Sequence, residues 1–465
     1  MDFDEYSFAD LLSNIVDNRG KTCPVEDKGF PLIATNCIKD DSLYPVFEKV
    51  RFVSDDTYKN WFRGHPNAGD IIFVCKGSPG RVAWVKEPVS FCIAQDMVAI
   101  RADQRLVDPM FLFSLLRSEQ VINKINNMHV GTLIPHFKKG DFKNLYLSIP
   151  RNLKIQRAIG LFYFSLSEKI EKNKEINQTL EQMAQALFKS WFVDFEPVKA
   201  KIAVLEAGGS QEDATLAAMT TISGKDADAL AVFEREHPEQ DAELKATAEL
   251  FPSAMQDSEL GEIPEGWSIK PLDGIATYQN GLALQKFRPE NENDFLPVVK
   301  IAQLKKGFSD GEEKASPNIK PECIIDNGDV VFSWSGSLMV DIWCGGKAAL
   351  NQHLFKVSST KYPKWLYYKY TAHHLIEFQR IAEAKAVTMG HIKREHLSQA
   401  KCLMPSSETV HAFTPFFEPV LNKVISNRLE TRKLENIRDT LLPKLLSGEI
   451  TLSEAEQAVS EVENV

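Results

Sequence analysis

The chain has 465 residues, of which 43% are hydrophobic and 25% are charged, and its formal net charge is −10. This composition is typical of a globular protein with two to four domains, and it excludes a disordered or fibrous protein. No run of 18 apolar residues occurs and the first five residues are acidic in character, so we expect neither a membrane-spanning helix nor a secretory signal peptide.

The negative charge is concentrated in two segments. Residues 203–265 hold 15 Asp and Glu against 3 Lys and Arg, and residues 449–465 hold five Glu and no basic residue. The rest of the chain therefore carries a net charge of +7, which permits a nucleic-acid partner without requiring one. The simpler alternative is that both acidic segments are ordinary solvated surfaces.

Residues 1–150 are predicted to fold as a first globular domain of strands and helices. Short apolar runs alternate with Gly, Pro and Asp, which is typical of strands joined by turns, and residues 109–128 have a helical pattern. Gly69-Asp70 before the apolar run Ile71-Ile72-Phe73 indicates a turn that enters a strand.

Residues 151–202 are predicted to form a first long helix, because apolar side chains recur there with a seven-residue period. A second set follows each member of the first set by three positions. The first set is Ile159, Leu166, Asn173, Leu180 and Leu187, and the second is Phe162, Lys169, Ile176 and Met183. Residues 203–260, rich in Ala, Glu and Asp, are predicted to form an acidic helical connector.

Beyond the connector the chain repeats its first part, with an offset of about 255–260 residues. Gly328-Asp329-Val330-Val331-Phe332 repeats the glycine-aspartate turn, and His391-Ile392-Lys393-Arg394 repeats His136-Phe137-Lys138-Lys139. Residues 261–405 are therefore predicted to be a second globular domain that resembles the first.

A second long helix is predicted over residues 406–448, followed by an acidic tail over 449–465. Its seven-residue pattern superimposes on that of the first helix at an offset of 254. The fold class we expect is α+β, with two similar globular domains of pseudo-two-fold symmetry that are separated by two long antiparallel helices forming a coiled coil.

Asn173 and Asn427 occupy equivalent positions near the middles of the two helices. If the helices pair antiparallel about a pseudo-two-fold axis, these midpoints meet. A buried Asn pair would then form its hydrogen bond only in the correct register, which exchanges some stability for specificity. The alternative is that both side chains point to solvent.

No motif for catalysis is found. A base methyltransferase would need an [ND]-P-P-[YF] segment, and Gly345-Gly346-Lys347-Ala348 lacks the spacing and the hydroxyl of a nucleotide-binding loop. The seven cysteines are separated and no C-x-x-C occurs, which predicts reduced thiols and a cytoplasmic location. The chain is therefore expected to be a binding protein with no catalytic residue and no metal site of its own.

Three segments resemble one protein family over nearly the whole chain. They are MAQALFKSWFVDF at residues 183–195, GEIPEGW at residues 261–267 and RDTLLPKLLSGEI at residues 438–450. Together with the repeated halves and helices, they resemble the specificity subunit of type I restriction-modification enzymes.

The resemblance implies a non-catalytic DNA-recognition subunit. Each globular half would recognise one part of a split DNA site, and the two helices would act as a spacer. The helices would also dock two modification (methyltransferase) subunits, and two restriction subunits would complete the complex. The chain would bind no cofactor, because S-adenosylmethionine, ATP and Mg²⁺ would be held by the partner subunits. The aromatic residues Phe188, Trp191 and Phe192 are expected to dock a partner.

Two segments of each half are the candidates for DNA contact, because Lys and Arg neutralise phosphates and Ser offers a small donor and acceptor. The alternative is that the two histidines are structural. The residues are Lys76, Ser78, Arg81, His136, Lys138 and Lys139 in the first half, and Ser335, Ser337, His391, Lys393 and Arg394 in the second.

A different class of function would fit the repeat and the helices equally well, namely a coiled-coil adaptor that binds proteins and no DNA. Only the basic body and the family resemblance favour the DNA-binding hypothesis. Salt dependence separates the two, since affinity that depends on phosphate contacts falls steeply as salt rises.

Overall fold

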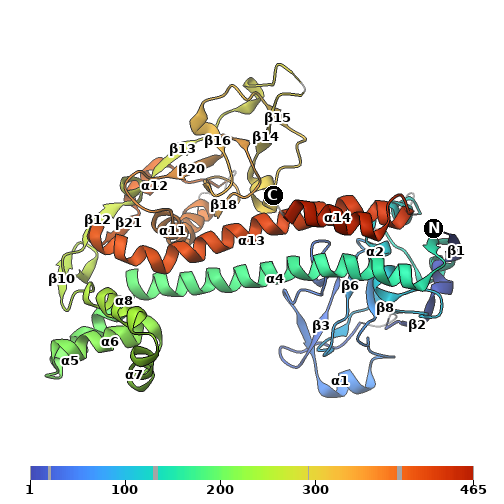
Figure 1. Ribbon diagram of the computed structural model, residues 1–465, viewed down its shortest axis with the longest axis horizontal. Coiled ribbons are helices and arrows are strands. Elements are labelled where there is room, and N and C mark those ends of the chain that lie inside the picture. Colours follow the sequence, from blue (N-terminus) through green and yellow to red (C-terminus); the bar gives the residue numbers. More distant parts are fainter. Residues whose placement is uncertain (1, 19–21, 129–134, 292, 385–389, 464–465) are drawn as a thin grey trace. The chain divides into compact units, whose positions relative to one another are not determined.

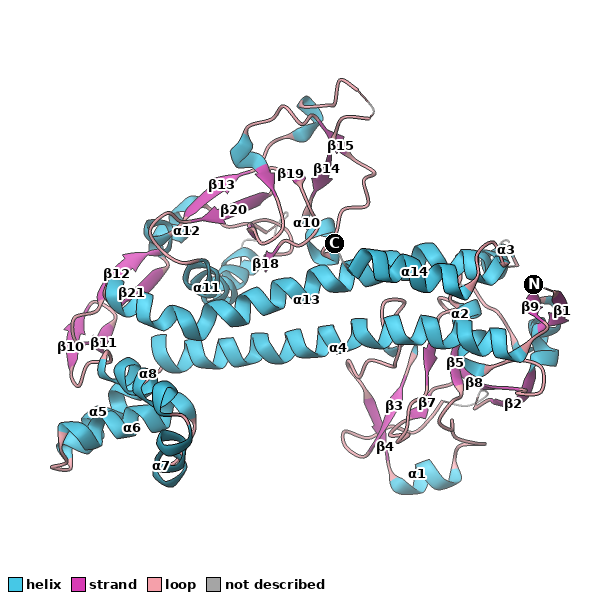
Figure 2. Cartoon of the chain, in the orientation of Figure 1, coloured by secondary structure: helices cyan, strands magenta, loops and turns pink. Residues whose placement is uncertain are grey.

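The computed structural model describes residues 2–18, 22–128, 135–291, 293–384 and 390–463. The chain divides into two compact units, one made of residues 1–174 with 430–465 and the other of residues 175–429. Figures 1 and 2 show that each unit contains one globular domain of mixed strands and helices. None of the described helices is long and apolar enough to cross a membrane.

The globular domain of the first unit is built on a four-stranded antiparallel sheet of order β2-β8-β5-β6. The same domain contains a three-stranded sheet of order β4-β3-β7, and β1 pairs with β9. The strands are β1 (Phe3–Ser7), β2 (Leu12–Val16), β3 (Phe30–Ile33), β4 (Arg51–Val53), β5 (Ile71–Val74), β6 (Val82–Trp84), β7 (Cys92–Ile93), β8 (Met97–Ala102) and β9 (Tyr146–Pro150).

Two short helices cover this core, α2 (Pro109–Leu116) and α3 (Glu119–Asn127), where a helical stretch was predicted. Asp108 begins α2 by accepting hydrogen bonds from the backbone N–H groups of Met110 and Phe111, the usual role of a residue that precedes a helix. Gly160 of the following long helix lets α2 approach closely, because a Cβ at Gly160 would lie 2.6 Å from the Phe111 nitrogen.

The second unit repeats this topology. Its four-stranded sheet has the order β13-β20-β17-β18, its other sheet has the order β15-β14-β19-β16, and β12 pairs with β21. The predicted duplication is therefore present, with β16 as the one strand of the second domain that has no counterpart among the described strands of the first. The strands are β12 (Ser268–Pro271), β13 (Thr277–Asn280), β14 (Leu296–Val299), β15 (Lys314–Ala315), β16 (Ile324–Ile325), β17 (Val330–Ser333), β18 (Met339–Ile342), β19 (Ala348–Leu350), β20 (Leu354–Ser358) and β21 (Lys401–Met404).

The helices of this domain are α9 (Leu272–Ile275), α10 (Ile301–Lys306), α11 (Lys364–Ala384) and α12 (Arg394–Gln399). The longest of them, α11, buries Trp365, Leu366 and Phe378 against the sheet.

The two long helices are α4 (Leu153–Phe192) and α13 (Ser407–Ser447), and each begins directly after the last strand of a globular domain. They run antiparallel (Figure 1). The first helix was predicted to reach residue 202 but ends at Phe192. Phe195 adopts a left-handed conformation with φ 55°, which breaks the helix before α5 (Glu196–Glu206) begins.

The connector is a small helical bundle rather than an extended linker. It consists of α5, α6 (Gln211–Ser223), α7 (Ala227–Glu236) and α8 (Pro238–Glu249), and a hairpin of β10 (Met255–Ser258) and β11 (Gly261–Pro264) follows. Lys201 is buried and donates to the carbonyl oxygens of Ala248 at 3.1 Å and Phe251 at 2.6 Å, which ties α5 to the end of α8.

The acidic tail forms a further helix, α14 (Leu452–Glu463), which belongs to the first unit. Ala455 is fully buried, in one apolar cluster with Leu445 and Leu446 at the end of α13 and with Phe111 and Phe113 of α2. The tail is therefore acidic on its surface but anchored by apolar packing.

Candidate nucleic-acid interface

The glycine-aspartate motif builds a turn that is braced by an ion pair. Gly69 has φ +84°, a conformation that glycine adopts without strain. Asp70 Oδ2 accepts a hydrogen bond from the Asn67 backbone N–H at 2.8 Å, and the guanidinium of Arg101 on β8 holds both carboxylate oxygens at 2.7 and 3.0 Å. The motif is therefore structural, and it fixes the start of β5.

The second unit repeats this turn with a different cation. Gly328 has φ +88°, and Asp329 Oδ2 accepts from the Asp326 backbone N–H at 2.8 Å. Lys356 of β20 takes the place of the arginine, with its Nζ 2.8 Å from Asp329 Oδ2. The equivalent turns confirm that both motifs enter equivalent strands.

In the first unit the structure brings together the two segments that were predicted to contact DNA. Lys76 and His136 form an antiparallel bridge just beyond the end of β5. The Gly77 N–H donates to the Pro135 carbonyl at 3.0 Å, and the Phe137 N–H donates to the Cys75 carbonyl at 2.8 Å. Phe137 is fully buried, so it anchors the segment in the core.

The second unit contains the same pair of segments, bridged between Ser335 and His391. The Gly336 N–H donates to the Gly390 carbonyl at 2.8 Å, and the Ile392 N–H donates to the Trp334 carbonyl at 3.0 Å. We call this arrangement the loop pair: residues 76–78 with 135–139 in the first unit, and residues 335–337 with 390–394 in the second.

Most predicted side chains of the loop pairs are exposed. Lys76, Ser78, Lys138 and Lys139 are exposed in the first unit, with His136 half-buried. In the second unit the exposed residues are Ser337, His391, Lys393 and Arg394. These side chains can reach a ligand that lies across the loop pair.

Three of the predicted DNA contacts, Arg81, Ser335 and Arg394, make internal contacts, and the exposed Arg394 donates to the Tyr278 carbonyl at 3.2 Å. The Arg81 guanidinium donates to the carbonyl oxygens of Ile38 at 2.8 Å and Thr35 at 3.3 Å, so it holds the segment that follows β3. Ser335 is 3% exposed and its Oγ lies 3.0 Å from His353 Nδ1. Buried polar groups of a protein need hydrogen-bond partners, and here the Arg81 and Ser335 side chains provide them. The same donors are then not available to DNA.

Sequence reasoning missed Lys305, an exposed residue near the end of α10. Its Nζ donates to Ser337 Oγ at 2.8 Å, which places a cation on the second loop pair from an element about 30 residues upstream. In the sequence, Lys305 is marked only by its neighbour Lys306, and two adjacent lysines are common at the solvent-exposed end of a helix.

A hollow of about 400 Å³ lies beside the second loop pair. Ser337, Gln379 and Glu383 contribute polar groups to its wall, with Gly336 and Gly390 at its edge. Among the residues that the structure describes, no three His, Cys, Asp or Glu side chains gather to hold a metal ion.

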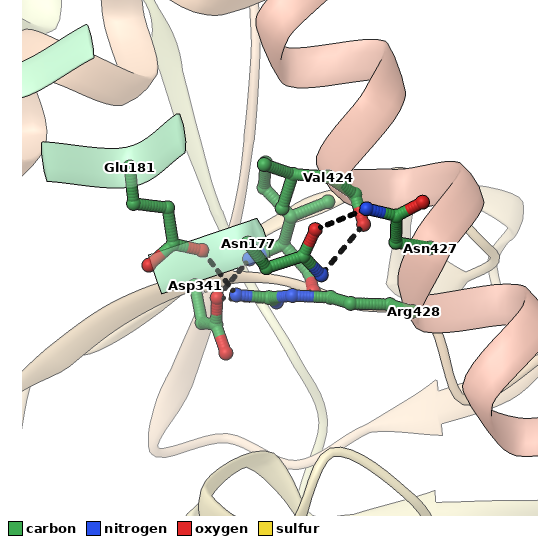
Figure 3. A network of polar contacts seen from close by, with 7 residues as sticks. Asn177, Glu181, Asp341, Val424, Asn427 and Arg428 are labelled. Atoms are coloured by element: carbon green, nitrogen blue, oxygen red, sulfur yellow. Dashed lines mark hydrogen bonds and ion pairs between the residues drawn. The ribbon is translucent and has the colours of Figure 1, made fainter. Parts of the chain in front are cut away.

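The helix register is fixed by an Asn pair, but not by the predicted one. Asn427 is 1% exposed and its Nδ2 donates to Asn177 Oδ1 at 2.9 Å, while Asn177 Nδ2 donates to the Val424 carbonyl at 3.2 Å (Figure 3). Asn173, one turn earlier, donates to Glu430 Oε2 at 2.9 Å. The expected pairing of Asn173 with Asn427 is therefore wrong by one helical turn, although both side chains are buried.

Phe188, Trp191 and Phe192 form part of a buried core, which corrects their expected role as a docking surface. Their exposed fractions are 0%, 0% and 2%. The Trp191 ring centroid lies 4.6 Å from that of Phe413 on α13, within the same cluster that holds Trp365 and Phe417. These aromatic residues join α4 and α13 to the second globular domain.

Comparisons with known proteins give one consistent family. A profile described as the type I restriction modification DNA specificity domain matches residues 23–182 and 264–437. The HindI specificity subunit of Haemophilus influenzae is 29% identical over 82% of this chain and 86% of its own, and the MjaIX specificity subunit of Methanocaldococcus jannaschii is 24% identical over 83% and 78%. A crystal structure of a type I restriction-modification S subunit from M. genitalium has the same fold, with a TM-score of 0.51, 13% identity and 96% of both chains covered.

Proposed function

Because this chain belongs to the type I restriction-modification DNA specificity family, with a match in each half, we propose that it recognises a DNA site in two parts. The chain is a DNA sequence-recognition subunit, and the coiled-coil adaptor is not favoured. The observation that carries the two-part proposal is the loop pair, which occurs once in each globular domain with the same backbone hydrogen bonds.

The side chains of the loop pairs divide into two kinds. Lys138 and Lys139 match Lys393 and Arg394, and such equivalent cations suit the phosphate backbone, which is the same at any sequence. Side chains that differ between the halves suit base recognition, because two different half-sites need different readers. Lys76 is exposed whereas Ser335, its equivalent in the second loop pair, is buried, so at this position only the first domain offers a side chain for base recognition.

The long helices supply the spacer in this proposal. They contain 40 and 41 residues, which gives about 60 Å at 1.5 Å per residue, against about 34–36 Å for one turn of B-DNA. Two contacts at the ends of such a spacer leave several base pairs unread between the half-sites. A change in helix length is expected to change that spacing and to leave both half-sites unaltered.

The partners we propose are two methyltransferase subunits, which bind the helices and methylate adenine, and two restriction subunits. S-adenosylmethionine, ATP and Mg²⁺ would be bound by those subunits, and the specificity chain itself would supply recognition alone. The exposed surfaces of α4 and α13 are the docking surface in this proposal, since the aromatic residues at the end of α4 are buried.

One experiment tests the function as a whole. The tagged chain is expressed in its native host, its partners are isolated, and methylated adenines are mapped across the genome with and without the gene. We expect recovery of a methyltransferase subunit and loss of a single bipartite motif on deletion. An unchanged methylation map with no such partner would refute the proposal, and loss of a continuous motif would refute its two-part form.

A further inference from the structure

Arg428 of α13 connects three elements of the second unit. Its Nη1 donates to Asp341 Oδ1 at 2.7 Å and to the Ile342 carbonyl at 2.9 Å, both on β18, and its Nη2 donates to Glu181 Oε1 of α4 at 2.9 Å (Figure 3). The side chains of Arg428 and Asp341 are about a quarter exposed. We call Arg428, Asp341 and Glu181 the helix-domain clamp.

The clamp is made of charge-assisted hydrogen bonds, which are shorter and stronger than those between neutral groups. Burial disfavours the charged guanidinium, but the carboxylates of Asp341 and Glu181 outweigh that effect, and the pKa of Arg428 is raised. Arg428 adjoins Asn427, whose amide fixes the register of the two helices. Neighbouring residues of one helical turn thus fix both the helix pair and the domain that it carries.

The first unit has an equivalent attachment. The offset of 254 residues places Lys174 where Arg428 stands and Glu435 where Glu181 stands. Lys174 Nζ donates to the Asp41 carbonyl at 2.7 Å and lies 3.9 Å from Glu435 Oε1. The Leu43 N–H of the same loop donates to Glu171 Oε1 at 3.0 Å.

Both attachments act on the same edge of the repeated sheet. In the second unit the clamp holds β18, the edge strand, directly. In the first unit the loop of residues 41–43 lies between the helix and the equivalent edge strand β6, whose Trp84 N–H donates to the Leu43 carbonyl at 2.9 Å. The helix pair is therefore attached at the equivalent sheet edge in both units, but through different side chains.

We propose that Arg428 is a positioning residue that holds the second recognition domain at a fixed angle on the helix pair, so that the second half-site is accepted at one distance only. The loop with Ser335 and Ser337 joins β17 to β18, so a fixed β18 fixes the loop pair as well. The inference rests on the proposed two-part recognition. In the experiment below, the spacer preference of the wild type tests that proposal, and the spacer preference of the variants tests the role of Arg428.

The experiment uses the complete complex with its methyltransferase subunits and a series of duplexes. Each duplex carries both half-sites, taken from the methylation map, with the native spacer or a spacer one or two base pairs longer or shorter. The variants are Arg428→Met, which keeps the aliphatic packing, and the milder Arg428→Lys and Asp341→Asn. The matched control is Arg380→Met, which removes an exposed arginine of α11 that forms an ion pair with Glu377 of the same helix.

We expect the wild type and Arg380→Met to prefer the native spacer strongly. In Arg428→Met the preference falls about tenfold, equivalent to about 1.4 kcal/mol, with base discrimination within each half-site unchanged. Arg428→Lys and Asp341→Asn are expected to lie in between, and they carry the test if Arg428→Met does not assemble. An unchanged spacer preference in the variants would overturn the inference, as would an equal loss of base discrimination. A wild type without any spacer preference would overturn the two-part proposal instead.

Discussion

The Asn177–Asn427 pair provides a direct measure of how much a buried polar contact contributes between the long helices. Replacing Asn427 by Ala removes a hydrogen bond of 2.9 Å and leaves the Asn177 side-chain oxygen buried without its donor. Such a loss costs about 1–3 kcal/mol, because the desolvation of the remaining group is no longer compensated. Replacing both residues by Leu removes both polar groups together, and we expect that variant to lie within about 1 kcal/mol of the wild type.

Urea unfolding followed by tryptophan fluorescence measures these differences, since Trp191 and Trp365 lie in the same unit as the pair. The expected order of stability places the single Ala variant lowest and the double Leu variant close to the wild type. The reasoning would be refuted by a single variant as stable as the wild type, or by a double variant that loses more stability than the single one. A change in the slope of the transition would indicate that the substitution alters the compactness of the native or unfolded state, or that unfolding is no longer two-state.

Three further outcomes are expected. Trp191→Ala should lower the free energy of unfolding by about 3–5 kcal/mol in urea denaturation, because it leaves a large cavity in the core; normal stability combined with loss of a partner subunit would restore its docking role. Replacing Lys138 and Lys139 by Ala should weaken DNA binding equally for cognate and unrelated duplexes and lower the salt slope by about 1 per residue, and a loss confined to the cognate site would contradict a phosphate role. Burial, with a contribution from His373, lowers the pKa of His374 to about 4 from its ordinary 6.5, so the unfolded chain is protonated first as the pH falls. The free energy of unfolding should therefore decrease between pH 6.5 and about 4, by at most about 3 kcal/mol, and His374→Gln should flatten that pH dependence.

The features predicted well from the sequence are those that local patterns determine. The turn at Gly69-Asp70 and its repeat at Gly328-Asp329 need a glycine in the left-handed conformation and an aspartate that accepts a hydrogen bond from a backbone N–H. Because these two residue types are adjacent in the sequence, the turn can be predicted from the sequence alone. The long helices follow from their seven-residue period for the same reason, and the duplication transfers each assignment to the other half.

The features predicted poorly depend on contacts between distant segments. The period of a helix identifies its packing seam but not its stagger against an antiparallel partner, so Asn427 pairs with Asn177 rather than with Asn173. The aromatic run that ends α4 looks like an exposed docking patch until the strands and helices of residues 261–405 are folded around Trp191. Arg81 is a residue type that often contacts DNA, but its guanidinium donates to two backbone carbonyl groups that lie more than 40 residues earlier in the sequence.

The burial of Leu445, Leu446 and Ala455 in the core of the first unit has a consequence for biosynthesis. The second unit is one continuous stretch of chain, whereas the first also needs residues 430–465, which are synthesised after every residue of the second unit. The second recognition domain can therefore fold while translation continues, but the first must wait with an incomplete core. A nonsense or frameshift mutation near residue 440 would consequently damage the domain encoded at the opposite end of the gene.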